Sequence, residues 1–327
     1  MTYYLGVDLG ATKSHTIIAD EQNHVVGFGQ AGPGNHQVIG YPGMLRTLRQ
    51  GLDQALSAAG ITASDICAAG FGVAGYDWPS QKPDMFKILN QLGLDCPMGL
   101  VNDGVPPLLA GATDGWGVAL VSGTGCNCRG WDKNRQREGR VTGYGYRMGE
   151  FAGGSELVWR AMYEVANEWT KRGQPTAIST AFIKFAGAKN LADLIEGYTE
   201  GYYSVNAKAA PLIFEAAESG DAVAQKLIRW TGVELGEMAK AVIRQLEFEA
   251  ETFDVVLSGS LFKGGRILID PLWETISQLA PNSRLVHLAA PPVIGSVILA
   301  MEQVGRFGTA EVRQSLNTTL EQFYSAG

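Results

Sequence analysis

The sequence has few of the side chains that proteins use to hold metal ions. Its 327 residues include four histidines and four cysteines, and neither an HExxH nor a CxxC arrangement occurs. Cys126 and Cys128 are separated by a single residue, which is too close for an ordinary zinc clip. We therefore expect no metal held by protein ligands alone, and thiols that stay reduced and mostly buried.

Positive charge is also scarce. Lysine and arginine number 26 against 33 acidic residues, which gives a formal net charge of −7. Binding to nucleic acid or to an anionic membrane needs a basic face, so we expect neither partner. No apolar run reaches the roughly 18 residues of a membrane-spanning helix, and residues 1–8 lack the basic start and cleavage site of a signal peptide. These absences predict a cytoplasmic protein.

Glycine, in contrast, is in excess. It accounts for 42 of the 327 residues, about 13% against roughly 7% in an average protein. Three short apolar runs end in loops of glycine and hydroxyl residues, a pattern typical of strands that enter tight turns. Glycine lets backbone N–H groups turn inward, and with Ser and Thr hydroxyls these groups form a cradle for an anion. The three loops are residues 10–13, 122–125 and 258–260.

The first two loops each connect a strand to a returning strand, so we expect two cradles on two domains to face one polyphosphate. The alternative is that each loop is an ordinary hairpin turn. Other phosphate-binding patterns do not fit. GxxxxGK[ST] is absent, and the GxGxxG match at residues 27–32 runs into Pro33 instead of opening a helix.

The remaining sequence predicts helices between the strands. Strands followed by helices in both halves indicate an α/β fold, and a length of about 150 residues per domain indicates two domains. We place the domains at residues 1–114 and 115–327, with the last helix packing back on the first domain. Apolar residues recur at helical spacing over residues 44–59, 157–169, 191–203 and 222–246.

Taken in order, the motifs resemble those of the actin-like ATPase superfamily, which contains sugar kinases, actin and heat-shock chaperones. The chain is most similar there to the N-acetylglucosamine kinase group of the BadF/BadG/BcrA/BcrD ATPase family. The motifs are Gly6-Val7-Asp8-x-Gly10-x-Thr12, Gly34-Asn35-His36, Asn102-Asp103-Gly104, Ser122-Gly123-Thr124-Gly125-x-Asn127-Cys128-Arg129, Gly143-Tyr144-Gly145 with Gly149-Glu150, and Ser258-Gly259-Ser260.

This resemblance implies two ribonuclease-H-like α/β domains that flank a cleft for a nucleotide and a sugar. It implies ATP and Mg²⁺ as cofactors and an amino sugar as substrate, and we also expect a homodimer. Asp8 would orient the metal through water, and Asp103 would be catalytic. The ATP-binding residues would be Gly10, Ala11, Thr12, Lys13, Gly123, Thr124, Gly125, Ala217, Gly259 and Ser260. The sugar-binding residues would be Asn35, Asp103, Gly143, Tyr144, Gly145 and Glu150.

The chain departs from the family pattern at three places. Glu150 stands where the family usually has Asp followed by Glu-Gly-Ser, Tyr144 stands where the kinase group often has Trp, and Gln37-Val38 replaces an aromatic residue. These differences bear on which sugar is bound.

Phosphoryl transfer to a sugar needs screened phosphates, an aligned hydroxyl and an acceptor for its proton. We expect Asp103 to be that acceptor, because a carboxylate near its ordinary pKa suffices when the proton leaves late. The alternative is that Asp103 only caps a helix that begins near Val105. The other assignments have alternatives of the same kind: Asp8 as a hydrogen-bonded turn residue, Lys13 as a solvated lysine, Glu150 as a helix-start carboxylate and Asn35 as a plain turn.

The sequence therefore predicts an ATP-dependent amino-sugar kinase, most readily one for N-acetylglucosamine. Glucosamine or another hexose is an alternative substrate. A second alternative is an ATPase that activates a radical dehydratase or reductase, which needs clustered thiolates for an iron–sulfur cluster. A third is a sugar or ATP sensor without turnover.

Overall fold

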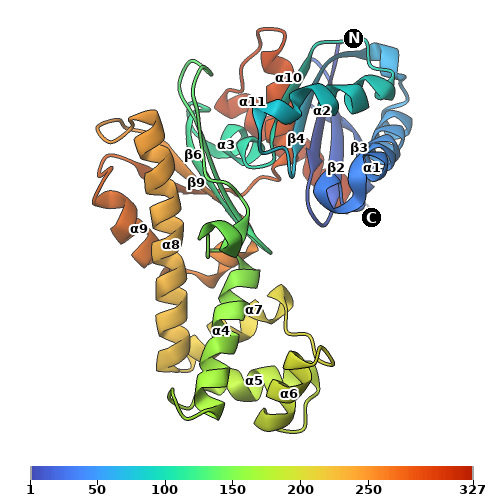
Figure 1. Ribbon diagram of the computed structural model, residues 1–327. Coiled ribbons are helices and arrows are strands. Elements are labelled where there is room, and N and C mark those ends of the chain that lie inside the picture. Colours follow the sequence, from blue (N-terminus) through green and yellow to red (C-terminus); the bar gives the residue numbers. More distant parts are fainter. Residues whose placement is uncertain (1, 326–327) are drawn as a thin grey trace.

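The computed structural model describes residues 2–325, which form two five-stranded mixed sheets (Figure 1). In the first sheet the order is β3-β2-β1-β4-β5. β2 is antiparallel to β1 and β3, whereas β4 is parallel to β1 and β5. The strands are β1 (Tyr3–Leu9), β2 (Ser14–Ala19), β3 (Val25–Ala31), β4 (Ile66–Val73) and β5 (Met98–Asn102).

The second sheet repeats this topology. Its order is β10-β9-β6-β7-β8, with β7 antiparallel to β6 and β8, and β9 parallel to β6 and β10. The predicted α/β class is therefore confirmed. The strands are β6 (Gly117–Ser122), β7 (Cys126–Trp131), β8 (Glu138–Arg140), β9 (Asp254–Ser258) and β10 (Arg284–His287).

Helices cover both faces of the first sheet because its strands carry apolar residues on both sides. Leu5, Val7 and Leu9 of β1 lie in one core with α1 (His36–Ala59) and α2 (Lys82–Leu89). Alternate residues face the opposite side of a strand, and Tyr4 accordingly lies in a second core with α10 (Val293–Glu302). The last helix, α11 (Ala310–Ser325), contacts β3 and α10 on that face.

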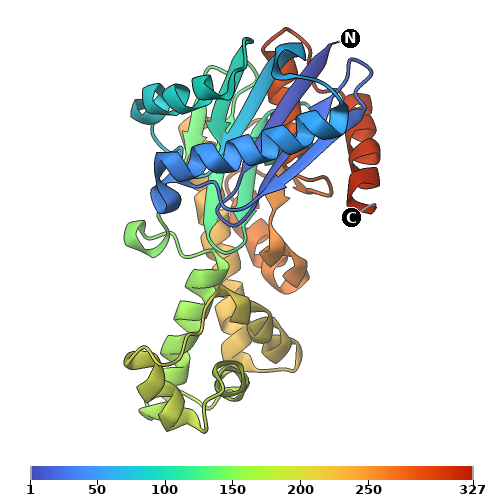
Figure 2. The same cartoon turned by 90° about the vertical axis from the view of Figure 1, so that its right-hand side faces the viewer.

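The second sheet carries its own core and an all-helical extension. α8 (Ala222–Leu246) and α9 (Arg266–Ser277) pack with each other and with the sheet, and the smaller helices project away from it (Figures 1 and 2). Those helices are α4 (Gly154–Trp169), α5 (Ala177–Ala186), α6 (Leu191–Thr199) and α7 (Ala210–Glu218).

Of the four predicted helices, α4 begins three residues early, at Gly154, and two others differ further. α1 begins at His36, before the predicted residue 44, because the chain continues as a helix across a kink at Gly40 (φ 67°) that is followed by Pro42. α6 ends at Thr199, before the predicted residue 203, because the chain turns at Gly201 (φ 80°). Glycine takes up such positive φ values at little cost, so both differences are local backbone effects.

The chain crosses between the two sheets twice. After the first crossing, β6 begins the second sheet at Gly117, close to the predicted boundary at residue 114, and α10 and α11 later return to the first sheet. We keep the two-domain division as a proposal, with these last helices completing the first domain. Within residues 2–325, none of the helices combines the length and the apolar character that crossing a membrane requires.

Helix α3 (Val105–Gly111) crosses α10 where the two sheets meet. Leu108 of α3 packs against the second sheet, and the backbones of the two helices almost touch. A Cβ at Gly295 of α10 would lie 1.9 Å from the Pro106 carbonyl oxygen, and one at Gly70 of β4 would lie 2.1 Å from the Ser296 carbonyl oxygen. Only glycine permits such approaches.

We predict that Gly295→Ala destabilises the protein by about 3 kcal/mol, because the new methyl group must push the α3 and α10 backbones apart. The measurement is the free energy of unfolding in urea. Gly32→Ala is the control, since a Cβ at Gly32 has no atom within 4 Å. Equal stability of the two variants would contradict the role given to the crossing.

Candidate functional site

The two glycine loops that the sequence predicts to be phosphate cradles are hairpin loops in the structure. The β1–β2 loop is closed by a hydrogen bond of 3.1 Å from Gly10 N to Lys13 O, and the β6–β7 loop by one of 2.9 Å from Gly123 N to Gly125 O. A Cβ at Gly123 would have only Ser260 Oγ within 4 Å, and a Cβ at Gly125 would have no atom within that distance. The second loop therefore leaves its surface open to a ligand.

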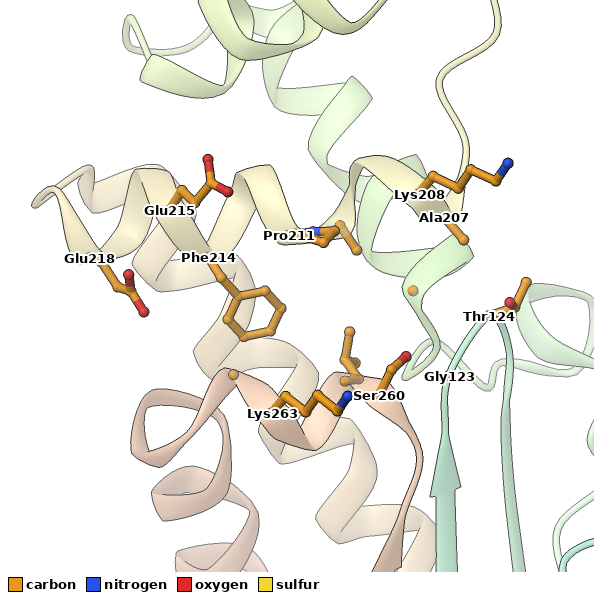
Figure 3. Close-up of a pocket in the computed structure, with 14 residues that line it drawn as sticks. Gly123, Thr124, Ala207, Lys208, Pro211, Phe214, Glu215, Glu218, Ser260 and Lys263 are labelled. Atoms are coloured by element: carbon orange, nitrogen blue, oxygen red, sulfur yellow. The ribbon is translucent and has the colours of Figure 1, made fainter. Parts of the chain in front are cut away.

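A cavity of about 510 Å³ opens beside the second loop (Figure 3). It lies between α7 and the 3₁₀ turn Ser260–Gly264, and it runs from Thr124 to Glu215 and Glu218 at the far end (Figure 3). The Phe214 ring forms part of its wall, and a Cβ at Gly264 would come within 2.1 Å of that ring. A concave, partly apolar cavity of this size suits a small organic ligand such as a nucleoside.

Of the three residues predicted to border the adenosine, only Ser260 lines this cavity. Gly259 shapes the loop instead, because its φ is 117° and a Cβ there would lie 2.1 Å from Ser122 O. Ala217 is 2% exposed and does not line the cavity. The structure thus does not bring Ala217 to the wall, where Phe214 of the same helix stands.

The first loop lines a different cavity, of about 540 Å³. Asp8 and residues 10–13 form one side of it, and residues 289–292 and Tyr324 form the other. The two predicted cradles therefore do not share one cavity in this structure. That they face one polyphosphate stays a prediction, and it requires the domains to close.

Asp8 and Asp103 are half-buried acids, and the charge of Asp103 acts on Asp8. Asp8 is the second-to-last residue of β1, and Asp103 directly follows β5. Burial raises the pKa of Asp8 to about 7, the Asp103 charge adds to the increase, and Lys13 opposes it. Two carboxylates in such a setting are stabilised by a cation.

Burial also raises the pKa of Asp103, to about 6. Arg129 opposes that increase, Asp77 adds to it, and a hydrogen bond with Asn127 opposes it. Asp103 is thus a carboxyl group whose charged form is only partly compensated by the protein.

These acids fit the expected Mg²⁺ only in part. Among residues 2–325, no group of three or more His, Cys, Asp or Glu side chains could hold a metal ion. Mg²⁺ needs less than that, since it commonly binds one or two carboxylates together with phosphate oxygens and waters. Asp8, next to the first loop, is suited to such a role.

The helix that follows Asp103 resolves one of the alternatives. α3 begins at Val105, its N-cap is Gly104, and no side chain caps it. Gly104 N donates instead to Asn102 Oδ1, at 2.9 Å. Asp103 is therefore not the helix cap, and its carboxyl group is free for another role.

Asn35 does cap a helix. Its Oδ1 accepts a hydrogen bond of 2.8 Å from Gln37 N at the start of α1. The alternative for Asn35 was a plain turn, and the structure shows a helix cap instead, which uses only the oxygen of the amide. The Nδ2 group remains as the donor that the predicted sugar contact would use.

The predicted sugar-binding loop, residues 142–150, is organised by Glu150. This carboxylate is 7% exposed and accepts hydrogen bonds from Thr142 N at 2.6 Å, Thr142 Oγ1 at 2.8 Å and Gly145 N at 3.3 Å. Gly143 and Gly145 have φ values of 73° and 61°. Glu150 therefore holds the loop, and the loop directs Tyr144 toward the first domain, where Gln37 Nε2 donates to its hydroxyl at 3.2 Å.

A buried polar network next to Asp103 was not predicted from the sequence. Asp77 accepts hydrogen bonds from three side chains, and Asn127 Nδ2 donates to Asn102 Oδ1 at 2.7 Å. Asn127 and Arg129 lay within a recognised motif without an assigned role. No sequence pattern pointed to Asp77, because the side chains that donate to its carboxylate are 25 to 52 positions away along the chain.

Comparison with known proteins identifies the family. The model of the BadF/BadG/BcrA/BcrD ATPase family matches residues 5–300, and the chain belongs to this family. The N-acetylmuramic acid/N-acetylglucosamine kinase of Clostridium acetobutylicum is 24% identical over 93% of this chain and 99% of its own length. The N-acetyl-D-glucosamine kinase of Dictyostelium discoideum is 23% identical over 91% of this chain and 97% of its own length.

A solved structure shows the same fold. It is a Chromobacterium violaceum protein provisionally named an N-acetylglucosamine kinase, with a TM-score of 0.69, 23% identity, and coverage of 91% of this chain and 98% of its own. The predicted actin-like ATPase architecture is thus confirmed.

For an ATPase family, the open second loop leads to a prediction about nucleotide binding. Gly123→Val should lower the affinity for ATP by at least about 2 kcal/mol, roughly 30-fold, because the branched side chain would enter the cavity beside Thr124. Calorimetric titration with a nonhydrolysable ATP analogue and Mg²⁺ measures the affinity. Gly32→Val is the matched control. Unchanged binding by the Gly123 variant would refute the cradle assignment.

Proposed function

We propose that this member of the BadF/BadG/BcrA/BcrD ATPase family is an ATP-dependent amino-sugar kinase, with N-acetylglucosamine as the first candidate acceptor. The observation that carries the proposal is the position of Asp103. Its carboxyl group does not cap α3 and has a pKa that burial raises to about 6. It also raises the pKa of Asp8, beside the first glycine loop, and forms a hydrogen bond with Asn127 of β7.

In the proposed reaction the nucleoside occupies the 510 Å³ cavity, and the phosphates extend past Thr124 toward the first loop. Backbone N–H groups and the hydroxyls of Thr12 and Thr124 hold the phosphate oxygens, and Lys13 adds positive charge. Mg²⁺, oriented by Asp8 through water, would screen the β- and γ-phosphates. Because the two loops line separate cavities, closure of the domains is part of the proposal.

The acceptor hydroxyl lies in line with the γ-phosphorus atom. As the new P–O bond forms and the bond to the β–γ bridging oxygen breaks, the hydroxyl proton passes to Asp103 and ADP leaves. The sugar is held by the Asn35 amide, by residues 143–145 and by Glu150, which keeps that loop in place. The Asn127 Oδ1 atom, buried and without a hydrogen-bond partner, is available to accept a hydrogen bond from a further hydroxyl.

The choice of an N-acetylated sugar draws support from the names of the two relatives. A coupled assay of ADP release tests it with N-acetylglucosamine, N-acetylmuramate, glucosamine, N-acetylmannosamine and glucose. Sugar-independent ADP release together with iron and visible absorption would favour the dehydratase activator. Binding of sugar and ATP without ADP release would favour the sensor.

We predict that Asp103→Asn lowers kcat by about 10²–10⁴-fold, because the variant keeps the shape of the side chain and removes the proton acceptor. ATP binding should persist, since the glycine loops lie on other segments. The thermal midpoint should not decrease, because Gly104 and not Asp103 is the N-cap of α3 and the variant removes a charge whose burial is unfavourable. Turnover within about threefold of the parent at a midpoint that has not decreased would exclude Asp103 as the base.

We further predict that kcat/KM for the sugar decreases below about pH 6. Asp103 must be charged to accept the proton, and its pKa is raised to about 6. Stability should respond with the opposite sign. The folded pKa exceeds the unfolded value of roughly 3.9, so the contribution of Asp103 to stability is present at low pH and is lost as pH rises through 6. Profiles of kcat/KM and of the unfolding midpoint between pH 5 and 8 measure both effects. A kcat/KM that stays constant down to pH 5 would contradict the assignment.

A further inference from the structure

Asp77 joins the three segments that form the proposed sugar side of the site. Its Oδ2 accepts a hydrogen bond from Gln37 Nε2 of α1 at 3.0 Å. Its Oδ1 accepts from Asn102 Nδ2 of β5 and from the Arg129 guanidinium of β7, both at 3.1 Å. We propose that Asp77, paired with Arg129, is a positioning residue that assembles the acceptor side of the site from both domains.

Each donor is linked to a residue of the proposed site. Gln37 donates its backbone N–H to Asn35 Oδ1, and its Nε2 group also donates to the Gly75 carbonyl oxygen and to the Tyr144 hydroxyl of the second domain. Asn102 directly precedes Asp103 and receives a hydrogen bond from Asn127 of the second domain. A displacement of the Asp77 carboxylate would therefore release the sugar-binding amide, the base and the sugar loop together.

Arg129 crosses from the second domain into this network. It is 1% exposed, and its second ion pair is with Glu138, at 3.1 Å. The Asp77 side chain is 10% exposed. Two charges so deeply removed from water are costly to place, and an apolar pair would serve stability equally well or better. The pair is thus better explained by the position that it imposes on its neighbours than by stability.

The network also leaves polar atoms without partners on the side of Asp103. Arg129 Nε and Asn127 Oδ1 are buried and make no hydrogen bond, and both residues point from the same face of β7. Buried polar atoms are nearly always paired in native proteins. Their presence beside Asp103 indicates that this wall is completed by a polar ligand, which the proposed function identifies as the acceptor sugar.

The inference rests on the proposed kinase function, and the experiment separates the two. Three variants are compared with the parent: Asp77→Asn, Arg129→Gln, and the double variant. Either single change leaves an uncompensated buried group, so both stability and activity should decrease. In the double variant the two charges are removed together, and the unfolding midpoint should return close to that of the parent.

For a positioning role, the double variant should still show a kcat/KM for the sugar at least about 30-fold below the parent, with the KM for ATP unchanged within about twofold. A purely structural pair predicts that activity returns together with the midpoint, and this result would overturn the proposal. The control pair is Arg135–Glu302, which is joined at 2.8 Å outside the site. Glu302→Gln should leave the sugar kinetics unchanged.

Gln37→Leu provides a second test should the buried variants not fold. Gln37 is exposed, so its loss should leave the fold intact. We expect the KM for the sugar to increase at least about tenfold while the KM for ATP stays constant. An unchanged KM for the sugar would contradict the proposal. If the parent protein phosphorylates no sugar, the proposed function itself fails, whatever the variants show.

Discussion

The approach of α10 to α3 determines how the two halves of the protein are placed. At Gly295 the helices are separated by less than the space of one methyl group, so the crossing tolerates no side chain at this position. α3 follows β5 and α10 follows β10, which occupy equivalent places in the two sheets. The crossing therefore brings the carboxyl ends of both sets of strands to the same region, and the functional loops emerge there.

The two sheets have the same topology, but their equivalent hairpins contribute different residues to the proposed site. The hairpin β1–β2 carries the first loop with Asp8 next to it, and the equivalent hairpin β6–β7 carries the second loop. β7 also contributes to the acceptor side, because its residues Asn127 and Arg129 donate hydrogen bonds to Asn102 and Asp77 of the first domain. The proposed nucleotide side thus belongs to the second sheet, whereas the acceptor side is assembled from both.

Buried charge is distributed unevenly over this region. Burial raises the pKa of Asp77 although the Arg129 charge opposes the increase. Burial likewise raises the pKa of Asp8 to about 7, with the Asp103 charge adding to it, and that of Asp103 to about 6, with the Asp77 charge adding to it. A cluster with this imbalance favours a cation or a proton. Those are the species that a phosphoryl-transfer site must bind and move, which is why the acids are suited to the proposed chemistry.

The sequence by itself determined the features that depend on neighbouring residues. Apolar runs that end in glycine and hydroxyl residues predicted the strands and loops at residues 10–13 and 122–125, because turn chemistry is local. Tertiary structure decided the rest. Asp103 had two interpretations, and the position of Gly104 as the helix cap excluded one of them. Ala217 matched a motif, but the rotation of α7 turns Phe214 to the cavity in its place. Asp77 gave no signal at all, because its three partners come from α1, β5 and β7, and only the packing of the two sheets brings these segments within hydrogen-bonding distance.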